Sequence, residues 1–155
     1  MTEEGKKAPD FRLAGIDSEG NETEYTLSGL LAAGRPLVLY FYPKDNTPGC
    51  TTEACDFRDN YNRLTGKATV AGVSPDSTAS HKKFNSQHGL NFVLLSDPGH
   101  DVLKAYEAWG EKKNYGKVYE GVIRSTYIID PDGTIRKKML NVKAAGHVEK
   151  VLELL

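Results

Sequence analysis

Residues 37–42, Leu-Val-Leu-Tyr-Phe-Tyr, are apolar at every position. A half-exposed strand alternates polar and apolar residues, whereas a strand buried on both faces does not. This run therefore predicts the central strand of a sheet that is covered on both sides. A loop with proline and glycine, residues 43–49, follows it directly. From residue 50 to about residue 64, apolar side chains recur at helical spacing, which predicts a helix.

Strands and helices alternate along much of the remaining chain. Two short strands, 11–13 and 24–27, suggest a hairpin added before the central strand. The order β-α-β, followed by a hairpin and a last helix, predicts an α/β thioredoxin-like fold with a mixed central sheet flanked by helices, in one domain spanning 1–155. The further elements that we expect are strands at 68–73, 92–95, 122–129 and 134–140, helices at 77–88, 100–106 and 147–155, and a turn at 130–133.

Charge and hydropathy exclude several classes of partner. The net charge is −1, from 20 basic and 21 acidic side chains, so we expect no binding to nucleic acid. The short basic cluster at 136–138 is interpreted as the solvated face of a strand. No apolar run approaches the roughly 20 residues that span a bilayer, and residues 1–7 are polar, unlike a secretory signal. We therefore expect a cytoplasmic protein that does not enter a membrane.

Only two cysteines are present, Cys50 and Cys55. A single close pair in a chain of this length is not the scaffold of a small secreted protein and instead indicates redox or metal chemistry. The four histidines, at 81, 88, 100 and 147, have no metal-ligand spacing with this pair, and there is no phosphate loop or haem signal. We therefore expect no cofactor, so that the thiols themselves carry the redox chemistry.

Cys50 stands where the proline- and glycine-bearing loop meets the predicted helix. The N-terminus of a helix offers free backbone N–H groups and a partial positive charge, which favour a thiolate over a thiol. The alternative is that Cys50 is only a small buried apolar residue. Its place beside Pro48 and Gly49 favours the reactive interpretation.

The segment around Cys50 resembles a known family. Pro43, Thr47 and Cys50 fit the P-x-x-x-[T/S]-x-x-C signature of peroxiredoxins, and the run from Tyr40 to Cys55 is similar to the bacterioferritin comigratory protein, or PrxQ, subfamily. The likeness covers nearly the whole chain. It continues in Gly72-Val-Ser-Pro-Asp76, Leu94-Leu-Ser-Asp-Pro98, Trp109-Gly-Glu-Lys112, Tyr115-Gly-Lys117 and Arg124-Ser-Thr-Tyr-Ile-Ile-Asp130.

This resemblance implies a role for each site residue. Cys50 would be the peroxidatic nucleophile, and Thr47 would hold thiolate and peroxide through its hydroxyl, unless it only stabilises the loop. Pro43 would shield the sulfur from water as well as ending the strand. Arg124, in an otherwise apolar run, would stabilise the thiolate and the charge that develops as the O–O bond breaks, unless it faces outward. Glu53 could orient Arg124 or cap the helix start.

Cys55 would be the resolving cysteine, which condenses with the sulfenic acid of Cys50. Five residues apart on an ideal helix, the two Cα atoms lie about 8–9 Å from each other. A disulfide tolerates about 7 Å, so the helix must unwind before the bond forms. The alternative is that Cys55 is inert and that a partner protein's thiol resolves Cys50.

Peroxiredoxins reduce hydrogen peroxide and organic hydroperoxides, and the resemblance implies thioredoxin or a similar dithiol as the reductant. An internal disulfide needs no second subunit, so we expect a monomer. Two other classes are weighed: a disulfide oxidoreductase, disfavoured because the spacing is C-x4-C and not C-x-x-C, and a binding or holdase protein, which would need no Thr47 or Arg124. Trp109 and Tyr115 either cover the active site or have only a packing role.

Overall fold

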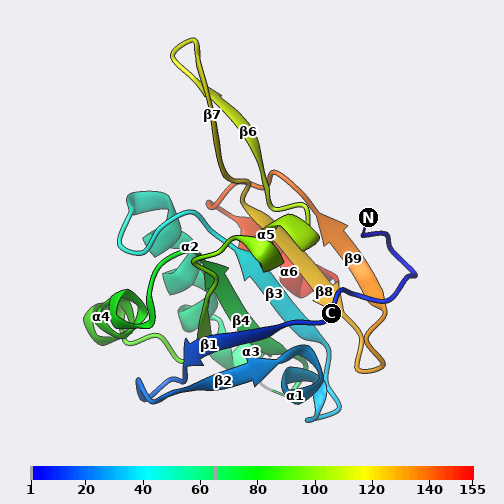
Figure 1. Ribbon diagram of the computed structural model, residues 1–155. Coiled ribbons are helices and arrows are strands. Elements are labelled where there is room, and N and C mark those ends of the chain that lie inside the picture. The colour runs from blue at the N-terminus through cyan, green and yellow to red at the C-terminus, as the bar shows by residue number, and fades with distance from the viewer. Residues whose placement is uncertain (1, 65) are drawn as a thin grey trace.

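The strand predicted to be central lies in the interior of the sheet. The structure is a computed structural model, and it describes residues 2–64 and 66–155. Strand β3 (Leu37–Phe41) is buried at all five positions. It pairs in parallel with β4 (Thr69–Ser74) and antiparallel with β8 (Ser125–Ile129), so the sheet is mixed, as expected (Figure 1).

The sheet has seven strands among the described residues, in the order β2-β1-β5-β4-β3-β8-β9. The predicted N-terminal hairpin is confirmed, and its first strand extends the sheet by pairing antiparallel with β5. The four strands β4-β3-β8-β9, with helices after β3 and β9, have the predicted thioredoxin-like order. The remaining bounds are β1 (Arg12–Ile16), β2 (Glu22–Thr26), β5 (Val93–Ser96) and β9 (Ile135–Met139).

Helices cover both faces of the sheet, and alternate residues of β3 enter two separate cores. Leu37, Leu39 and Phe41 pack with residues of α1 and α5, whereas Val38 and Tyr40 pack with residues of α2, α3, α4 and α6. This explains why the strand is apolar throughout. The bounds are α1 (Leu27–Leu31), α2 (Pro48–Asp59), α3 (Tyr61–Leu64), α4 (Thr78–His88), α5 (Asp101–Ala105) and α6 (His147–Glu153). None of the helices described is long and apolar enough to cross a membrane.

The helix predicted for residues 50–64 is wrong at its start and in its continuity. It begins at Pro48, whose fixed φ suits the first helical position and whose missing N–H has no intrahelical partner to lose. It ends at Asp59, and Asn60 follows as the C-cap with φ of −98°. The Asn60 amide side chain donates to the Asp56 carbonyl at 2.8 Å, and a separate turn, α3, follows.

A second difference concerns a hairpin that the sequence did not predict. Strands β6 (Trp109–Asn114) and β7 (Lys117–Val122) pair antiparallel and project from the body (Figure 1). Tyr115 and Gly116 have φ of 53° and 77°, as a two-residue hairpin turn requires. The strand expected at 122–129 is therefore divided between β7 and β8, and Arg124 lies in the break.

The N-terminal segment runs beside β9 (Figure 1). The Gly5 N–H donates to the Ile135 carbonyl, and the Ile135 N–H donates to the Lys6 carbonyl, both at 2.8 Å. Thr2 is buried, and its hydroxyl contacts that of Tyr127 at 2.8 Å. Residues 2–8 are thus held against the sheet.

We predict that Gly72→Ala destabilises the fold, because a Cβ there would lie 2.8–2.9 Å from the buried ring of Tyr40. Overpacking of this kind costs about 1–3 kcal/mol. Gly99→Ala is the matched control, since its Cβ would meet only Asp101 at 3.8 Å. Chemical denaturation checks this, and equal free energies of unfolding for the two variants would contradict it.

Candidate active site

Cys50 is the third residue of α2, and its side chain is buried. Thr47 precedes the helix but makes no side-chain bond to the first-turn amides. The N–H groups of that turn have no partner within the helix, so they leave a partial positive charge beside the thiol. The position of Cys50 at a helix start is therefore confirmed, two residues further into the helix than expected.

Arg124 joins Cys50 to Glu53. Its Nη2 donates to Cys50 Sγ at 3.2 Å, and its Nη1 donates to Glu53 Oε1 at 2.5 Å. The arginine side chain is 15% exposed and the glutamate is fully buried. The alternative of an outward-facing Arg124 is therefore wrong. Of the two roles considered for Glu53, its contact matches the one in which it orients Arg124.

Burial and charge act in opposite directions on this pair. Burial raises the pKa of Glu53 to about 7, although the Arg124 charge and hydrogen bond oppose the rise. Burial also disfavours the charged form of Arg124, yet the nearby Glu53 and Cys50 outweigh that effect and raise the pKa of Arg124. The second carboxylate oxygen of Glu53 is buried without a hydrogen-bond partner. The guanidinium of Arg124 therefore stays charged beside the sulfur, whereas burial disfavours the charged form of Glu53.

Thr47 and Pro43 belong to the loop before α2. The Thr47 hydroxyl donates to the Lys44 carbonyl at 2.8 Å, which is the loop-stabilising contact. Pro43 and Arg124 line a cavity of about 670 Å³. Ile123, Leu140 and Val142 form apolar parts of its wall, and charged residues 107 and 111–113 line other parts. The cavity therefore gives access to Arg124 from solvent.

Cys55 lies on α2 with Cys50, partly exposed, and both thiols are free. The expectation that the dithiol form is helical between them is confirmed. At helical spacing the two Cα atoms are about 8–9 Å apart, too far for a disulfide.

Sequence reasoning missed one group near the site. Tyr42, Asp45 and His81 form a buried polar cluster that begins at the residue directly after β3. His81 is 36 positions from Asp45, and nothing in the local pattern connects them.

Within 2–64 and 66–155, no group of His, Cys, Asp or Glu could hold a metal ion. Tyr115 is 98% exposed at the hairpin turn and does not cover the site, while Trp109 stacks on His100 with 3.9 Å between ring centroids.

We predict that Glu53→Gln changes how stability depends on pH. With a pKa of about 7 when folded against 4.5 as the reference, the folded state holds the Glu53 proton more tightly than the unfolded state does. The stabilising effect of that proton is complete below about pH 4.5 and is lost as the pH rises to 7. At about 1.4 kcal/mol per pKa unit, the glutamine variant should gain about 3 kcal/mol over wild type between these limits. Urea denaturation at pH 4.5 and pH 8 measures this, and a gap independent of pH would contradict it.

Comparison with protein families and known proteins is consistent with this site. The AhpC/TSA family model matches residues 5–138. A putative peroxiredoxin bcp of Helicobacter pylori is 50% identical over 154 residues, covering 99% of this chain and 97% of that protein. Peroxiredoxin Bcp of Bacillus subtilis is 46% identical, covering 97% of this chain and 93% of its own.

Solved structures of peroxiredoxins are also similar to this chain. The bacterioferritin comigratory protein of Xanthomonas campestris, studied for its alkyl peroxide reduction activity, is 38% identical with a TM-score of 0.83, covering 92% of this chain and 88% of that one. A mutant of PrxQ from Xylella fastidiosa is 37% identical with a TM-score of 0.87, covering 99% and 94%. With this fold, these relatives and the family match over most of its length, the chain belongs to the AhpC/TSA family and is a peroxiredoxin of the Bcp or PrxQ type, an enzyme that reduces peroxides with cysteine thiols.

Proposed function

We propose that Cys50 is the peroxidatic cysteine and that it reduces hydrogen peroxide and organic hydroperoxides. The observation that carries this proposal is the hydrogen bond of 3.2 Å from Arg124 to Cys50 Sγ, in a site where Glu53 fixes the guanidinium. The Cys50 thiolate attacks one peroxide oxygen and the O–O bond breaks. The other oxygen leaves as hydroxide or alkoxide and takes a proton, giving water or alcohol and a Cys50 sulfenic acid. Arg124 stabilises the negative charge at both stages.

Thr47 and Pro43 complete the pocket in this proposal. The Thr47 hydroxyl already donates its hydrogen to the Lys44 carbonyl, so its oxygen keeps lone pairs that are free to accept a hydrogen. Such an oxygen can accept the hydrogen of a bound peroxide and hold it in line with the Cys50 sulfur. Pro43, on the cavity wall, excludes water from the sulfur.

Cys55 is proposed as the resolving cysteine. Its thiol displaces the hydroxyl of the Cys50 sulfenic acid as water, and a disulfide forms between the two sulfurs. The spacing on α2 requires residues 50 to about 56 to unwind first. The first turn of a helix has few intrahelical partners for its N–H groups, so opening it there is inexpensive.

We further propose that residues 1–155 act as one domain and as a monomer in the cytoplasm. A thioredoxin-type dithiol would attack the exposed disulfide and restore both thiols. Support comes from the Cys50 and Cys55 pair lying in one chain, which makes a second subunit unnecessary. No cofactor enters this cycle.

The experiment that tests this function compares Cys50→Ser with Cys55→Ser. Cys50→Ser should abolish peroxide consumption with the fold intact, because a serine hydroxyl is not ionised near neutral pH. Cys55→Ser should keep the first reaction with peroxide nearly normal, block recycling by dithiol, and accumulate sulfenic or sulfinic Cys50. Stopped-flow kinetics and peptide mass spectrometry measure both.

In oxidised wild type, a peptide bridged between Cys50 and Cys55 is expected. A dimer linked through Cys50, or free Cys55 beside oxidised Cys50, would refute the resolving role. Peroxidase turnover retained by Cys50→Ser would refute the whole assignment.

Charged side chains line part of the cavity beside Arg124, but its apolar residues Ile123, Leu140 and Val142 support organic hydroperoxides as substrates. The Xanthomonas campestris relative was studied for alkyl peroxide reduction. We predict that Ile123→Glu lowers the rate with cumene hydroperoxide by about tenfold or more, since a charge there repels an apolar group. The rate with hydrogen peroxide, which has no such group, should change far less. Equal loss with both substrates would show that Ile123 does not contact the organic group.

A further inference from the structure

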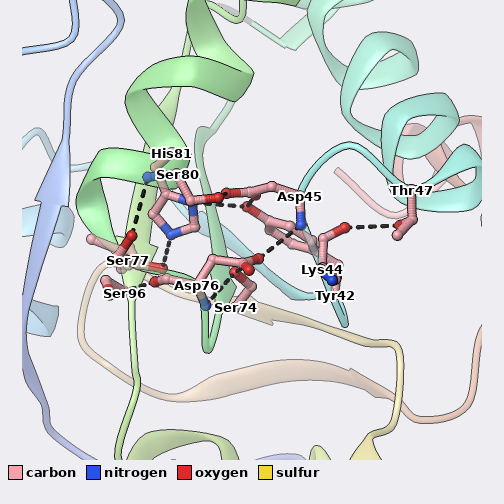
Figure 2. A network of polar contacts seen from close by, with 11 residues as sticks. Tyr42, Lys44, Asp45, Thr47, Ser74, Asp76, Ser77, Ser80, His81 and Ser96 are labelled. Carbon is pink, nitrogen blue, oxygen red and sulfur yellow. Dashed lines mark hydrogen bonds and ion pairs between the residues drawn. The ribbon is translucent and has the colours of Figure 1, made fainter.

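Asp45 lies in the loop between Pro43 and Thr47 and is bonded by three side chains at once (Figure 2). Its Oδ1 accepts from the Tyr42 hydroxyl at 2.6 Å. Its Oδ2 accepts from the Ser80 hydroxyl at 2.8 Å and faces His81 Nδ1 at 2.7 Å. Asp45 is 6% exposed and His81 is fully buried. A carboxylate so deeply placed in a loop is unusual unless its partners are fixed.

The proton balance makes Asp45 and His81 one unit. His81 Nε2 lies 2.8 Å from the Leu95 carbonyl, which can only accept, so Nε2 carries a hydrogen. An ionised Asp45 carboxylate likewise can only accept a hydrogen bond. One further proton must therefore lie between Asp45 Oδ2 and His81 Nδ1. The result is a short hydrogen bond between Asp45 and His81 that is shielded from water.

A second set of bonds holds the loop through its backbone. The Asp45 N–H donates to Asp76 Oδ2 at 2.7 Å, and the Ser74 hydroxyl donates to the same oxygen at 2.7 Å. The Ser96 hydroxyl donates to the Asp76 carbonyl. All of these partners belong to β4, β5, α4 or the connection between them (Figure 2). None belongs to α2.

The loop links this cluster directly to the peroxide pocket. Lys44 is adjacent to Asp45 in the chain, and its carbonyl is the acceptor that orients the Thr47 hydroxyl. A displacement of Asp45 therefore moves the Lys44 carbonyl, and with it the direction in which the Thr47 oxygen presents its lone pairs. The path runs from His81 through Asp45 and Lys44 to Thr47, with short contacts at each step.

We propose that Asp45 and His81 are positioning residues for the peroxide reaction, which act by holding the loop from Pro43 to Thr47 in place. This inference depends on the function proposed above. Because the anchors lie outside α2, the loop keeps its shape when α2 unwinds, and Cys50 returns to a prepared pocket after each reduction. The pair thus serves the rate with peroxide rather than the reactivity of the thiol.

The test compares His81→Gln with His81→Asn. The asparagine amide occupies the place of Nδ1 and can still donate to Asp45, whereas the glutamine amide occupies that of Nε2 and reaches only the Leu95 carbonyl. His81→Gln should slow the reaction of Cys50 with hydrogen peroxide by about ten- to a hundredfold, as small misplacements of reacting groups do. His81→Asn should remain within about threefold of wild type on the same grounds.

A second measurement separates positioning from general damage. Alkylation of Cys50 by iodoacetamide needs the thiolate but not the Thr47 hydroxyl, so its rate should be unchanged in His81→Gln. Amide exchange at residues 44–47 should rise in His81→Gln and not in His81→Asn. Should His81→Gln fail to fold, Asp45→Ala and Asp45→Asn give the same comparison, because the asparagine keeps a group of the same size between Tyr42 and His81.

Three results would overturn the proposal: equal peroxide rates in the paired variants, equal slowing of alkylation and peroxide reaction, or unchanged exchange in the loop. If the wild type itself does not consume peroxide but amide exchange at residues 44–47 responds as expected, the proposed function is wrong. The result that Asp45 and His81 hold the loop in place would then still be valid.

Discussion

The bond from Arg124 to both Cys50 and Glu53 is the interaction on which the site depends. The two acceptors are three residues apart on α2, so they face the same side of the helix. Arg124 lies on the sheet side, in the break between β7 and β8. One guanidinium therefore fastens the first turns of the helix to the sheet and sets the charge beside the sulfur. In the proposed cycle, oxidation of the Cys50 sulfur removes the negatively charged acceptor and so weakens this attachment.

The proposed cycle accordingly requires one part of the site to move and another part to stay in place. Among the described residues, the buried side chain of Glu53 bonds only to Arg124, and one of its oxygens has no partner. Unwinding exposes that carboxylate to water and removes the cost of its burial. The loop before the helix is different, because Asp45 is bound by Asp76, in the connection after β4, and by Ser80 of α4.

Local patterns predicted what depends on nearby residues. The apolar run at 37–42 predicted the buried strand, and α4 ends at residue 88 as expected, where Gly89 follows with φ of 59°. The pairing of Arg124 with the site came from a charge within an apolar run and from the family resemblance. Two features were not predicted from the sequence. Strands β6 and β7 are mostly polar and exposed, so they lack the alternation of apolar residues that marks a strand facing a core. The contact of His81 with Asp45 spans 36 residues and only the assembled sheet creates it.

The N-terminal segment beside β9 has a further consequence. β9 is the last strand of the sheet, and an unpaired edge offers backbone donors and acceptors to any other extended chain. Here Gly5 and Lys6 occupy part of that row, and the Lys138 N–H is taken by Glu4 Oε2 at 3.0 Å. Lys138 also binds Glu107 at 2.6 Å and the Thr2 carbonyl at 2.8 Å, which holds the segment down. The chain's own first residues therefore protect this edge against the strand-to-strand association that leads to aggregation.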